Sequence, residues 1–256
     1  MSDTSNSEQP TFVLLHGFPL DRRVWDDVIT DLITTRRILT PDLKGFGERA
    51  GEAVKGMSIE SLADDVHARL VKLRALPCVL GGLSMGGYVA LAFAKKYATD
   101  LRGLILIDTK CTADTPEGKT ARMSMIDLVR ASGTPGVVEQ MLPKMLAPQT
   151  YTSREDVVTR LKTIMHTCPP TTIEAACLAM RDREDFTQTL RTIDVPVLTI
   201  VGAHDVITPP DGANAMSKLV NHTRSTVQVI QGAGHMSPLE QPKAVADAID
   251  TFLRTL

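Results

Sequence analysis

Short segments typical of strands alternate along this chain with longer segments in which apolar residues recur at helical spacing. The strand segments are Thr11–Leu15, 36–40, 77–80, 104–107, 197–201 and Thr226–Ile230. Most are apolar runs stopped by glycine, proline or a polar residue, as expected of strands buried on both faces. Helices are predicted at 22–33, from a cap at Ser58 to Leu73, at 86–97, and from a capping box at Ser237–Glu240 that has proline in the first helical position. The alternation predicts an α/β fold, with a mostly parallel sheet of about six strands and helices on both faces.

The interval 111–185 breaks this alternation. It holds no convincing strand, but residues typical of helix N-caps occur at Thr115, Thr134, Ser153 and Thr171, the last followed by Glu174. We therefore expect a core formed by 11–110 and 186–256, interrupted by an all-helical cap of about 75 residues at 111–185.

Methionines gather in this interval. Six of the eleven lie there, namely Met123, Met125, Met141, Met145, Met165 and Met180. Methionine side chains adapt to irregular shapes and suit the roof of an apolar pocket, although ordinary core filling explains any one of them equally well.

Composition narrows the class of protein. The chain has 256 residues, a formal net charge of −2 and 43% hydrophobic residues, which is typical of a globular domain and gives no reason to expect a nucleic-acid partner. The four cysteines form no C-x-x-C pair and are too few for a disulfide framework, which favours a reducing compartment. Cys78, in an apolar run, is expected to be a buried thiol.

The N-terminus also favours a protein of a reducing compartment. Residues 1–10 are polar and lack the basic and apolar regions of a signal peptide, so we expect a disordered tail there. The longest apolar runs are too short to cross a bilayer. We expect a cytoplasmic protein without a membrane partner, and the sequence does not indicate its oligomeric state.

The run Gly82-Leu83-Ser84-Met85-Gly86 marks the first candidate for chemistry. A Gly-x-Ser-x-Gly pattern arises by chance in roughly one chain in ten of this length, so the pattern alone is weak. Here it falls between an apolar strand and an Ala-rich helix, where a strand–nucleophile–helix turn belongs. Such a turn lifts the serine hydroxyl above the sheet edge, and the two glycines remove side chains that would collide there.

Two other glycine-loop sites are excluded at this position. A dinucleotide fingerprint starting at Gly81 needs glycine at 83, which is Leu83. A P-loop starting at Gly81 needs Lys followed by Ser or Thr after Gly86, where the chain has Gly87-Tyr88. Two interpretations of this segment therefore stay open, a turn that carries a nucleophilic serine and a purely structural turn.

A serine nucleophile needs a base to take its proton and an acid to orient the base. In this architecture the chain order is Ser, then Asp or Glu, then His. Asp205 follows the fifth strand and His235 the sixth, so both are expected at the same sheet edge as Ser84. Asp108, at the end of the fourth strand, is the one serious rival to Asp205, and its alternative role is a cap for the chain entering the insertion.

The other histidines fit the base position less well. His67 lies in a polar helix and is expected to be exposed, His166 lies in the insertion, and His222 lies in a polar loop. His204 neighbours the proposed acid and could shape the pocket. His16 precedes Ser84 in the chain, so it is expected to hold the loop after the first strand.

That loop, His16-Gly17-Phe18-Pro19, can offer a backbone N–H to an oxyanion. Its partner would be the N–H of the residue after the nucleophile. The oxyanion donors are therefore expected to be the amides of Phe18 and Met85.

The motifs HGFP, GLSMGG, VGAHD and GAGH, in this order, resemble those of the α/β-hydrolase superfamily over about residues 11–254. The chain resembles bacterial 3-oxoadipate enol-lactonases, and related groups are the small carboxylesterases, including the pimeloyl-ester esterase of biotin synthesis. The resemblance implies a hydrolase without a cofactor, with a helical cap over the site. It also supports Ser84, Asp205 and His235 as a catalytic triad.

Two features depart from the family pattern. Many relatives begin with a β-hairpin, whereas only residues 1–10 precede the first strand here, so the sheet should be shortened at that edge. In the loop after Pro41, Lys44 replaces the usual arginine. Neither departure touches the triad.

The expected reaction is hydrolysis of a small carboxylic ester or lactone through an acyl-enzyme on Ser84. Enol-lactonase, perhydrolase, thioesterase and C–C bond hydrolase chemistry use the same residues and stay open, whereas dehalogenases and epoxide hydrolases of this fold need aspartate in place of the serine. A protein of another class, which binds a ligand or signals with a nearly silent triad, also stays open.

The pocket and its charges are less defined by the sequence. We expect it to be lined by Pro19, Trp25, Met123, Met145 and Met236. A lactone substrate with a carboxylate would need a cation, for which Arg122, Arg130, Lys144, Arg160 and Arg181 are candidates, although each is more simply a solvated surface charge. No metal is expected, because no two histidines stand at ligand spacing.

Overall fold

The computed structural model describes residues 9–221, 223 and 225–256, in which six parallel strands form one sheet. The strands are β1 (Thr11–Leu15), β2 (Ile38–Leu39), β3 (Cys78–Leu83), β4 (Leu101–Ile107), β5 (Val197–Gly202) and β6 (Thr226–Ile230), in the spatial order β2-β1-β3-β4-β5-β6. This confirms the predicted fold class. Of the predicted tail at 1–10, residues 1–8 lie outside the described residues, as does His222.

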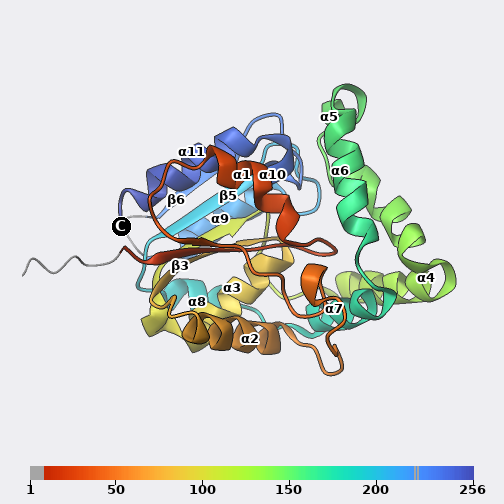
Figure 1. The fold of residues 1–256 in the computed structure, drawn as a ribbon, viewed down its shortest axis with the longest axis horizontal. Helices are drawn as coiled ribbons and strands as arrows, with labels where there is room; N and C mark the ends of the chain where they lie inside the picture. The colour runs from red at the N-terminus through yellow and green to blue at the C-terminus, as the bar shows by residue number, and fades with distance from the viewer. Residues whose placement is uncertain (1–8, 222, 224) are drawn as a thin grey trace, which may run out of the picture.

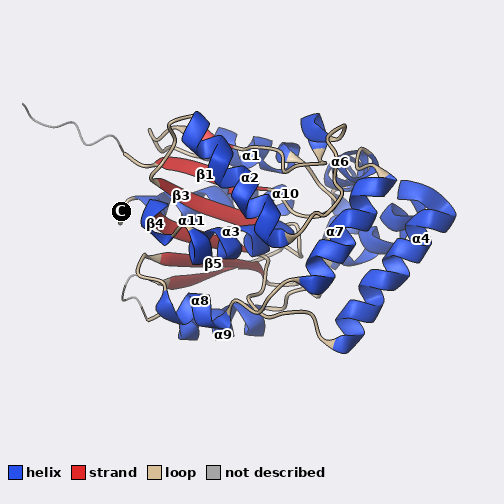
Figure 2. Cartoon of the chain, turned by 90° about the horizontal axis from the view of Figure 1, so that it is seen from below, coloured by secondary structure: helices blue, strands red, loops and turns tan. Residues whose placement is uncertain are grey.

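Helices cover both faces of the sheet (Figures 1 and 2). On one face lie α2 (Ile59–Lys72), α3 (Met85–Lys96), α8 (Thr187–Thr192) and α9 (Pro210–Leu219). On the other lie α1 (Asp26–Asp31), α10 (Ser237–Glu240) and α11 (Pro242–Leu253). Short 3-10 turns occur at Arg22–Trp25, Gly47–Arg49, Ala98–Asp100 and Leu142–Lys144.

The strands are apolar on both faces because both faces are covered. In β1, Phe12 and Leu14 pack against the α11 side, whereas Val13 and Leu15 pack against the α2 and α3 side. All four side chains are fully buried, which explains why these strands occur as continuous apolar runs.

The remaining helices lie between β4 and β5, in an interval whose residues are all described and which contains no strand. They are α4 (Pro116–Met141), α5 (Pro148–Ser153), α6 (Glu155–His166) and α7 (Pro170–Asp182). Figure 1 shows them gathered beyond the end of the sheet to which the strands point. We call them the helical insertion, and that it forms a separate cap domain stays a prediction.

Helix starts were predicted with mixed success. Ser58 caps α2 in a capping box with Ser61, and the Thr115 hydroxyl accepts a hydrogen bond from the Gly118 N–H (3.2 Å), as the sequence indicates. Two predicted caps were wrong, because Ser153 ends α5 and donates to the Gln149 carbonyl, and Thr171 lies inside α7. The predicted helix start at Thr134 is present, since α4 is two helices joined at a kink at Gly133 (φ +64°, ψ −169°), but the Thr134 hydroxyl donates to the Cys168 carbonyl (2.8 Å).

Two further boundaries differ from the prediction. The second strand is confined to Ile38–Leu39, because it is an edge strand that pairs only with β1. The capping box at Ser237–Glu240 was wrong. That segment is the short α10, which stops at Gln241 before Pro242, and the side chains of Ser237 and Glu240 bind other parts of the molecule.

Backbone segments approach closely where β3 turns into α3. A Cβ on Gly82 would lie 2.2 Å from the Gly86 carbonyl oxygen, and one on Gly86 would lie 2.4 Å from the Leu15 oxygen. Real Cβ atoms do not come so close to backbone atoms, so both positions require glycine. The two glycines of the motif therefore act as the sequence predicts.

Replacing Gly82 with alanine should destabilise the fold by about 1–3 kcal/mol, because the new methyl group meets rigid backbone. Urea unfolding measures this change. The matched control is Gly212→Ala in α9, where a Cβ meets nothing within 4 Å and stability should change by at most about 1 kcal/mol, upward. Equal stabilities for the two variants would contradict the packing described here.

Candidate active site

Ser84 stands in the turn between β3 and α3, with a backbone that L-residues rarely adopt. Its φ is +51° and its ψ is −111°, and its N–H donates to the Ile107 carbonyl oxygen at 2.9 Å. Such a conformation costs about 1–3 kcal/mol and persists only where the surroundings enforce it. Here it lifts a half-buried serine side chain above the end of the sheet.

His235 and Asp205 meet Ser84 in one continuous chain of hydrogen bonds. His235 Nε2 lies 3.0 Å from Ser84 Oγ, and His235 Nδ1 lies 2.8 Å from Asp205 Oδ2. Asp205 follows β5 and His235 follows β6, so three separate strand ends supply the three groups. The order nucleophile, base and orienting acid is the one that activates a serine hydroxyl.

Asp205 is held as an ionised acceptor. Burial opposes its charge, but hydrogen bonds from His235 and Thr208 outweigh burial and lower the pKa of Asp205. Its Oδ1 accepts from the N–H groups of Ile207 (2.8 Å) and Thr208 (2.9 Å), and its Oδ2 accepts from the Thr208 hydroxyl (2.6 Å). Thr208 is not among the predicted site residues, although a serine or threonine three positions after an aspartate is typical of such a turn.

Burial and the neighbouring negative charges shift the pKa of His235 in opposite directions. Burial favours the neutral ring, but the hydrogen bond and charge of Asp205, with the charges of Asp108 and Glu240, raise the pKa of His235. With Nδ1–H donating to Asp205, the neutral ring leaves Nε2 free to accept the proton of Ser84. The arrangement can therefore take a proton and hold it.

Asp108, the rival acid, occupies a different position. Its backbone φ is +44°, its Oδ1 accepts from the Gly202 N–H (2.8 Å), and its Oδ2 accepts from the Ser237 hydroxyl (2.5 Å). Burial and the nearby charge of Asp205 raise the pKa of Asp108 to about 7. The hydrogen bond to His235 is therefore made by Asp205. Asp108, after β4, bonds Gly202 and Ser237 instead.

The amides expected to bind an oxyanion belong to two segments next to Ser84. Met85 is the first residue of α3, so its N–H has no acceptor within the helix, and the helix N-terminus favours negative charge there. Phe18 lies in the loop after β1, whose Gly17 would place a Cβ 3.2 Å from Ser84 Cβ. Within the described part of the chain, the Phe18 amide donates to no other group.

His16 holds this loop, as the sequence analysis expects. Its Nε2 accepts from the Leu43 N–H (3.0 Å) and its Nδ1 bonds the Gly17 carbonyl oxygen (2.9 Å). Burial lowers the pKa of His16, which keeps the ring neutral, as this bonding pattern requires.

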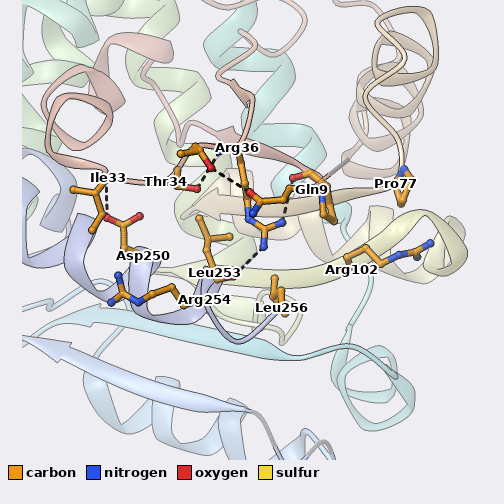
Figure 3. Close-up of a pocket in the computed structure, with 12 residues that line it drawn as sticks. Gln9, Ile33, Thr34, Arg36, Pro77, Arg102, Asp250, Leu253, Arg254 and Leu256 are labelled. Atoms are coloured by element: carbon orange, nitrogen blue, oxygen red, sulfur yellow. Dashed lines mark hydrogen bonds between the residues drawn. The ribbon is translucent and has the colours of Figure 1, made fainter. Parts of the chain in front are cut away.

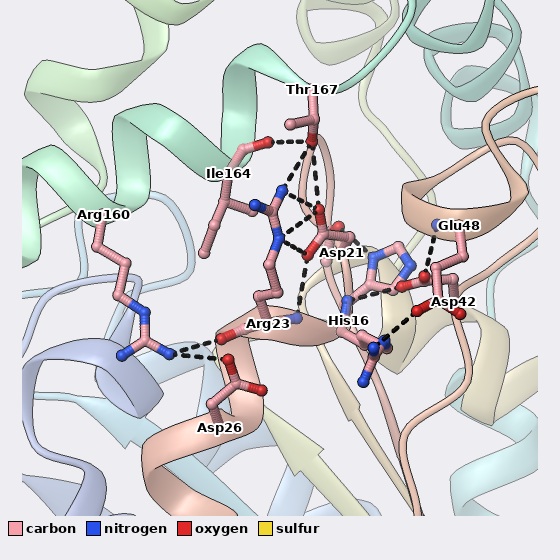
Figure 4. Close-up of polar contacts among 11 residues, drawn as sticks. His16, Asp21, Arg23, Asp26, Asp42, Glu48, Arg160, Ile164 and Thr167 are labelled. Atoms are coloured by element: carbon pink, nitrogen blue, oxygen red, sulfur yellow. Dashed lines mark hydrogen bonds and ion pairs between the residues drawn. The ribbon is translucent and has the colours of Figure 1, made fainter.

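The same loop is tied to the helical insertion through charged side chains (Figure 4). Buried Asp21 pairs with Arg23 (2.6 Å), and both bond the Thr167 hydroxyl at the end of α6. Arg160 of α6 reaches back to the Arg23 carbonyl and to Asp26. The insertion is therefore anchored beside the proposed oxyanion loop.

Three other described histidines, His67, His166 and His204, form no hydrogen bond with Ser84. His67 is not exposed as expected; its ring stacks on Tyr97 at 3.7 Å between centroids and bonds Asp100 Oδ2 (2.8 Å). His204 and His166 are exposed. No group of three or more His, Cys, Asp and Glu side chains in the described ranges is arranged to hold a metal ion.

The residues expected to line a pocket separate into two sets. Trp25, Met145 and Met236 are fully buried in one cluster, and Pro19 is also buried. Met123 lies apart, 37% exposed on α4, with its sulfur 3.0 Å from Arg181 Nη1. A role for any of them in binding substrate stays a prediction.

Most of the candidate cations of the insertion are already paired. Arg122 pairs with Asp114, Arg130 with Glu174, Arg160 with Asp26 and Asp27, and Arg181 with Asp182, while Lys144 is exposed and has no ion pair among the described residues. Each of these arginines therefore already has a carboxylate partner nearby in the chain or in the fold.

A hollow of about 730 Å³ lies at the opposite end of the sheet from Ser84 (Figure 3). Gln9, Pro77 and Arg102, at or beside the amino ends of β1, β3 and β4, contribute to it. Arg36 crosses it to donate to the Leu253 carbonyl oxygen (2.9 Å). It shares no residue with the Ser84 constellation.

Comparisons with known proteins agree with this architecture. The alpha/beta hydrolase family model matches residues 12–248. A thermophilic esterase from Thermogutta terrifontis is 38% identical, with a TM-score of 0.91 over 96% of this chain and 90% of that chain. An enol-lactonase from Burkholderia xenovorans LB400 is 22% identical, with a TM-score of 0.85 over 96% and 91%, which shows the fold alone.

A relative is also found among curated proteins. A pimeloyl-acyl-carrier-protein methyl ester esterase from Neisseria meningitidis is 28% identical over 247 residues, which cover 94% of this chain and 75% of that protein.

Among the described residues, no helix is both long and apolar enough to cross a membrane.

The pKa values of the two buried histidine rings should be shifted in opposite directions, upward for His235 and downward for His16. We expect the pKa of His235 to lie above its ordinary value in wild type and to fall in Asp205→Asn, because the variant loses the carboxylate that offsets burial most. His16 should stay neutral in both proteins. NMR titration of the imidazole resonances measures this, and an unchanged His235 pKa in the variant would contradict the pairing.

Proposed function

The chain belongs to the alpha/beta hydrolase family and is a carboxylic ester hydrolase, and we propose that it acts through an acyl-enzyme on Ser84. One observation carries the proposal. Ser84 Oγ, both nitrogens of His235 and Asp205 Oδ2 form an unbroken line at 3.0 and 2.8 Å.

The first step acylates the serine. Ser84 Oγ attacks the ester carbonyl carbon while its proton passes to His235 Nε2. The carbonyl oxygen becomes an oxyanion that accepts hydrogen bonds from the amides of Phe18 and Met85, and Asp205 stabilises the imidazolium. The intermediate then breaks its C–O bond, and the leaving alcohol takes the proton from His235.

The second step releases the acid. A water molecule gives a proton to His235 Nε2 and attacks the acyl carbon, and the second oxyanion uses the same two amides. Its collapse breaks the bond to Ser84 Oγ, which recovers its proton from His235. The carboxylic acid leaves, and the enzyme returns to its starting state without a cofactor taking part.

The charges of the helical insertion favour an uncharged ester over one with a free carboxylate. Arg122, Arg130, Arg160 and Arg181 are paired with local carboxylates, and Lys144 is exposed. Apart from Lys144, each of these cations already has a local carboxylate partner, with which a substrate carboxylate would have to compete. We therefore place a small neutral ester or lactone ahead of an enol-lactone that carries a carboxylate.

A binding or signalling role is the alternative of another class. Ser84→Ala should abolish turnover of p-nitrophenyl acetate, because the hydroxyl is the group that attacks; a loss of about 10³-fold or more is expected. A fluorophosphonate should label wild type at Ser84 and leave the variant unlabelled. Wild type that neither turns over the ester nor takes the label would favour the binding role.

Substrate charge gives a separate test. Nitrophenyl esters of butyrate and of succinate differ chiefly in a terminal carboxylate, and kcat/KM should be about tenfold or more higher for the butyrate, since a desolvated charge without a partner costs over 1 kcal/mol. Higher kcat/KM for the succinate ester would indicate a cation in the pocket and favour an enol-lactonase type of substrate.

A further inference from the structure

Glu240 is a buried carboxylate that the proposed mechanism does not use. It is 2% exposed, at the end of α10, and has no ion pair among the residues that the structure describes. Burying a carboxylate without a cation is costly, so its position needs hydrogen bonds that offset the cost.

Three neutral donors supply those bonds, from two sides. Glu240 Oε2 accepts from the Gly234 N–H (2.6 Å), one residue before His235. Glu240 Oε1 accepts from the Ala147 N–H (2.7 Å) and from the Thr150 hydroxyl (2.6 Å), at the start of α5. The carboxylate thus bridges the loop that carries His235 and the helical insertion.

The two segments are also in direct contact. A Cβ on Gly234 would lie 2.6 Å from the Ala147 nitrogen, and the Met236 N–H donates to the Met145 carbonyl oxygen (3.1 Å). The stretch from Met145 to Thr150 therefore contacts the residues directly before and after His235 in the chain.

Charge adds a second link between Glu240 and His235. The charge of Glu240 helps to raise the pKa of His235, together with Asp205 and Asp108. The charged or titratable groups around Glu240 are His204 beside β5, Tyr151 and Arg154 at α5, and His235 itself. Burial raises the pKa of Glu240, and the three hydrogen bonds act against that rise.

We propose that Glu240 is a positioning residue for His235, which fixes the ring through Gly234 and links its orientation to the Met145–Thr150 stretch of the insertion. The inference rests on the proposed function, since its readout is the base role of His235. It does not require Glu240 to touch substrate.

Glu240→Gln tests the role with little change of shape. The amide keeps one oxygen but turns an N–H₂ group toward a donor and removes the charge. We expect kcat/KM to fall about 10- to 100-fold, mainly through kcat, because His235 is displaced. The acidic limb of the kcat/KM profile should move to lower pH, because loss of a nearby negative charge lowers the pKa of His235.

Thr150→Val is the matched control. It removes one hydrogen bond on the insertion side and keeps both the charge and the Gly234 bond. We expect a smaller fall in kcat/KM, about fivefold, with the acidic limb in place. Thermal unfolding of both variants is measured alongside, because a merely structural link would lower Tm without moving the limb.

The inference is overturned if Glu240→Gln keeps the wild-type kcat and acidic limb, whatever happens to Tm. If Glu240→Gln does not fold, Thr150→Val decides, and a wild-type kcat/KM overturns it. Wild-type turnover and fluorophosphonate labelling, measured in the same experiment, distinguish a failure of the proposed function from a failure of the Glu240 inference. Their absence sinks the proposed function and this inference together, whereas an active wild type matched by Glu240→Gln sinks the inference alone.

Discussion

Close backbone packing around the turn at Ser84 is the constraint on which the rest of the site depends. Gly82 and Gly86 let β3, α3 and the end of β1 approach within distances that a Cβ would prevent. Ser84 has a positive φ in this turn, and the loop that carries the Phe18 amide lies against the Ser84 side chain. The site is thus defined first by backbone sterics, and only then by side-chain chemistry.

Parallel strand order completes the arrangement. β5 and β6 are neighbours on the same side of β3, so the loops carrying Asp205 and His235 open at the same sheet edge as Ser84. Three buried carboxyl groups, those of Asp205, Asp108 and Glu240, then surround one imidazole and offset the effect of burial on it. Asp205 alone forms a hydrogen bond with the ring. Asp108 and Glu240 act on the ring through their charge, and each accepts a backbone N–H, from Gly202 and from Gly234 respectively.

The sequence alone predicts the fold and the Ser84, His235 and Asp205 geometry well, for a physical reason. Each group directly follows a buried apolar strand, and parallel strands end at one edge, so adjacency in space follows from local pattern. Contacts between remote segments leave no such local signal. Arg130 pairs with Glu174, and Ser237 and Glu240 match a capping box although tertiary partners take their side chains. Thr134 does follow the kink at which the second half of α4 starts, but its hydroxyl bonds the Cys168 carbonyl of a remote segment.

The central claim is that a covalent acyl group forms on Ser84. A p-nitrophenyl dimethylcarbamate transfers a group that serine hydrolases release slowly, so the intermediate should accumulate after mixing. Intact-protein mass spectrometry followed by peptide mapping should find one carbamoyl group per chain, on Ser84. Release of nitrophenol with no mass increase, or with the group on another residue, would contradict the account.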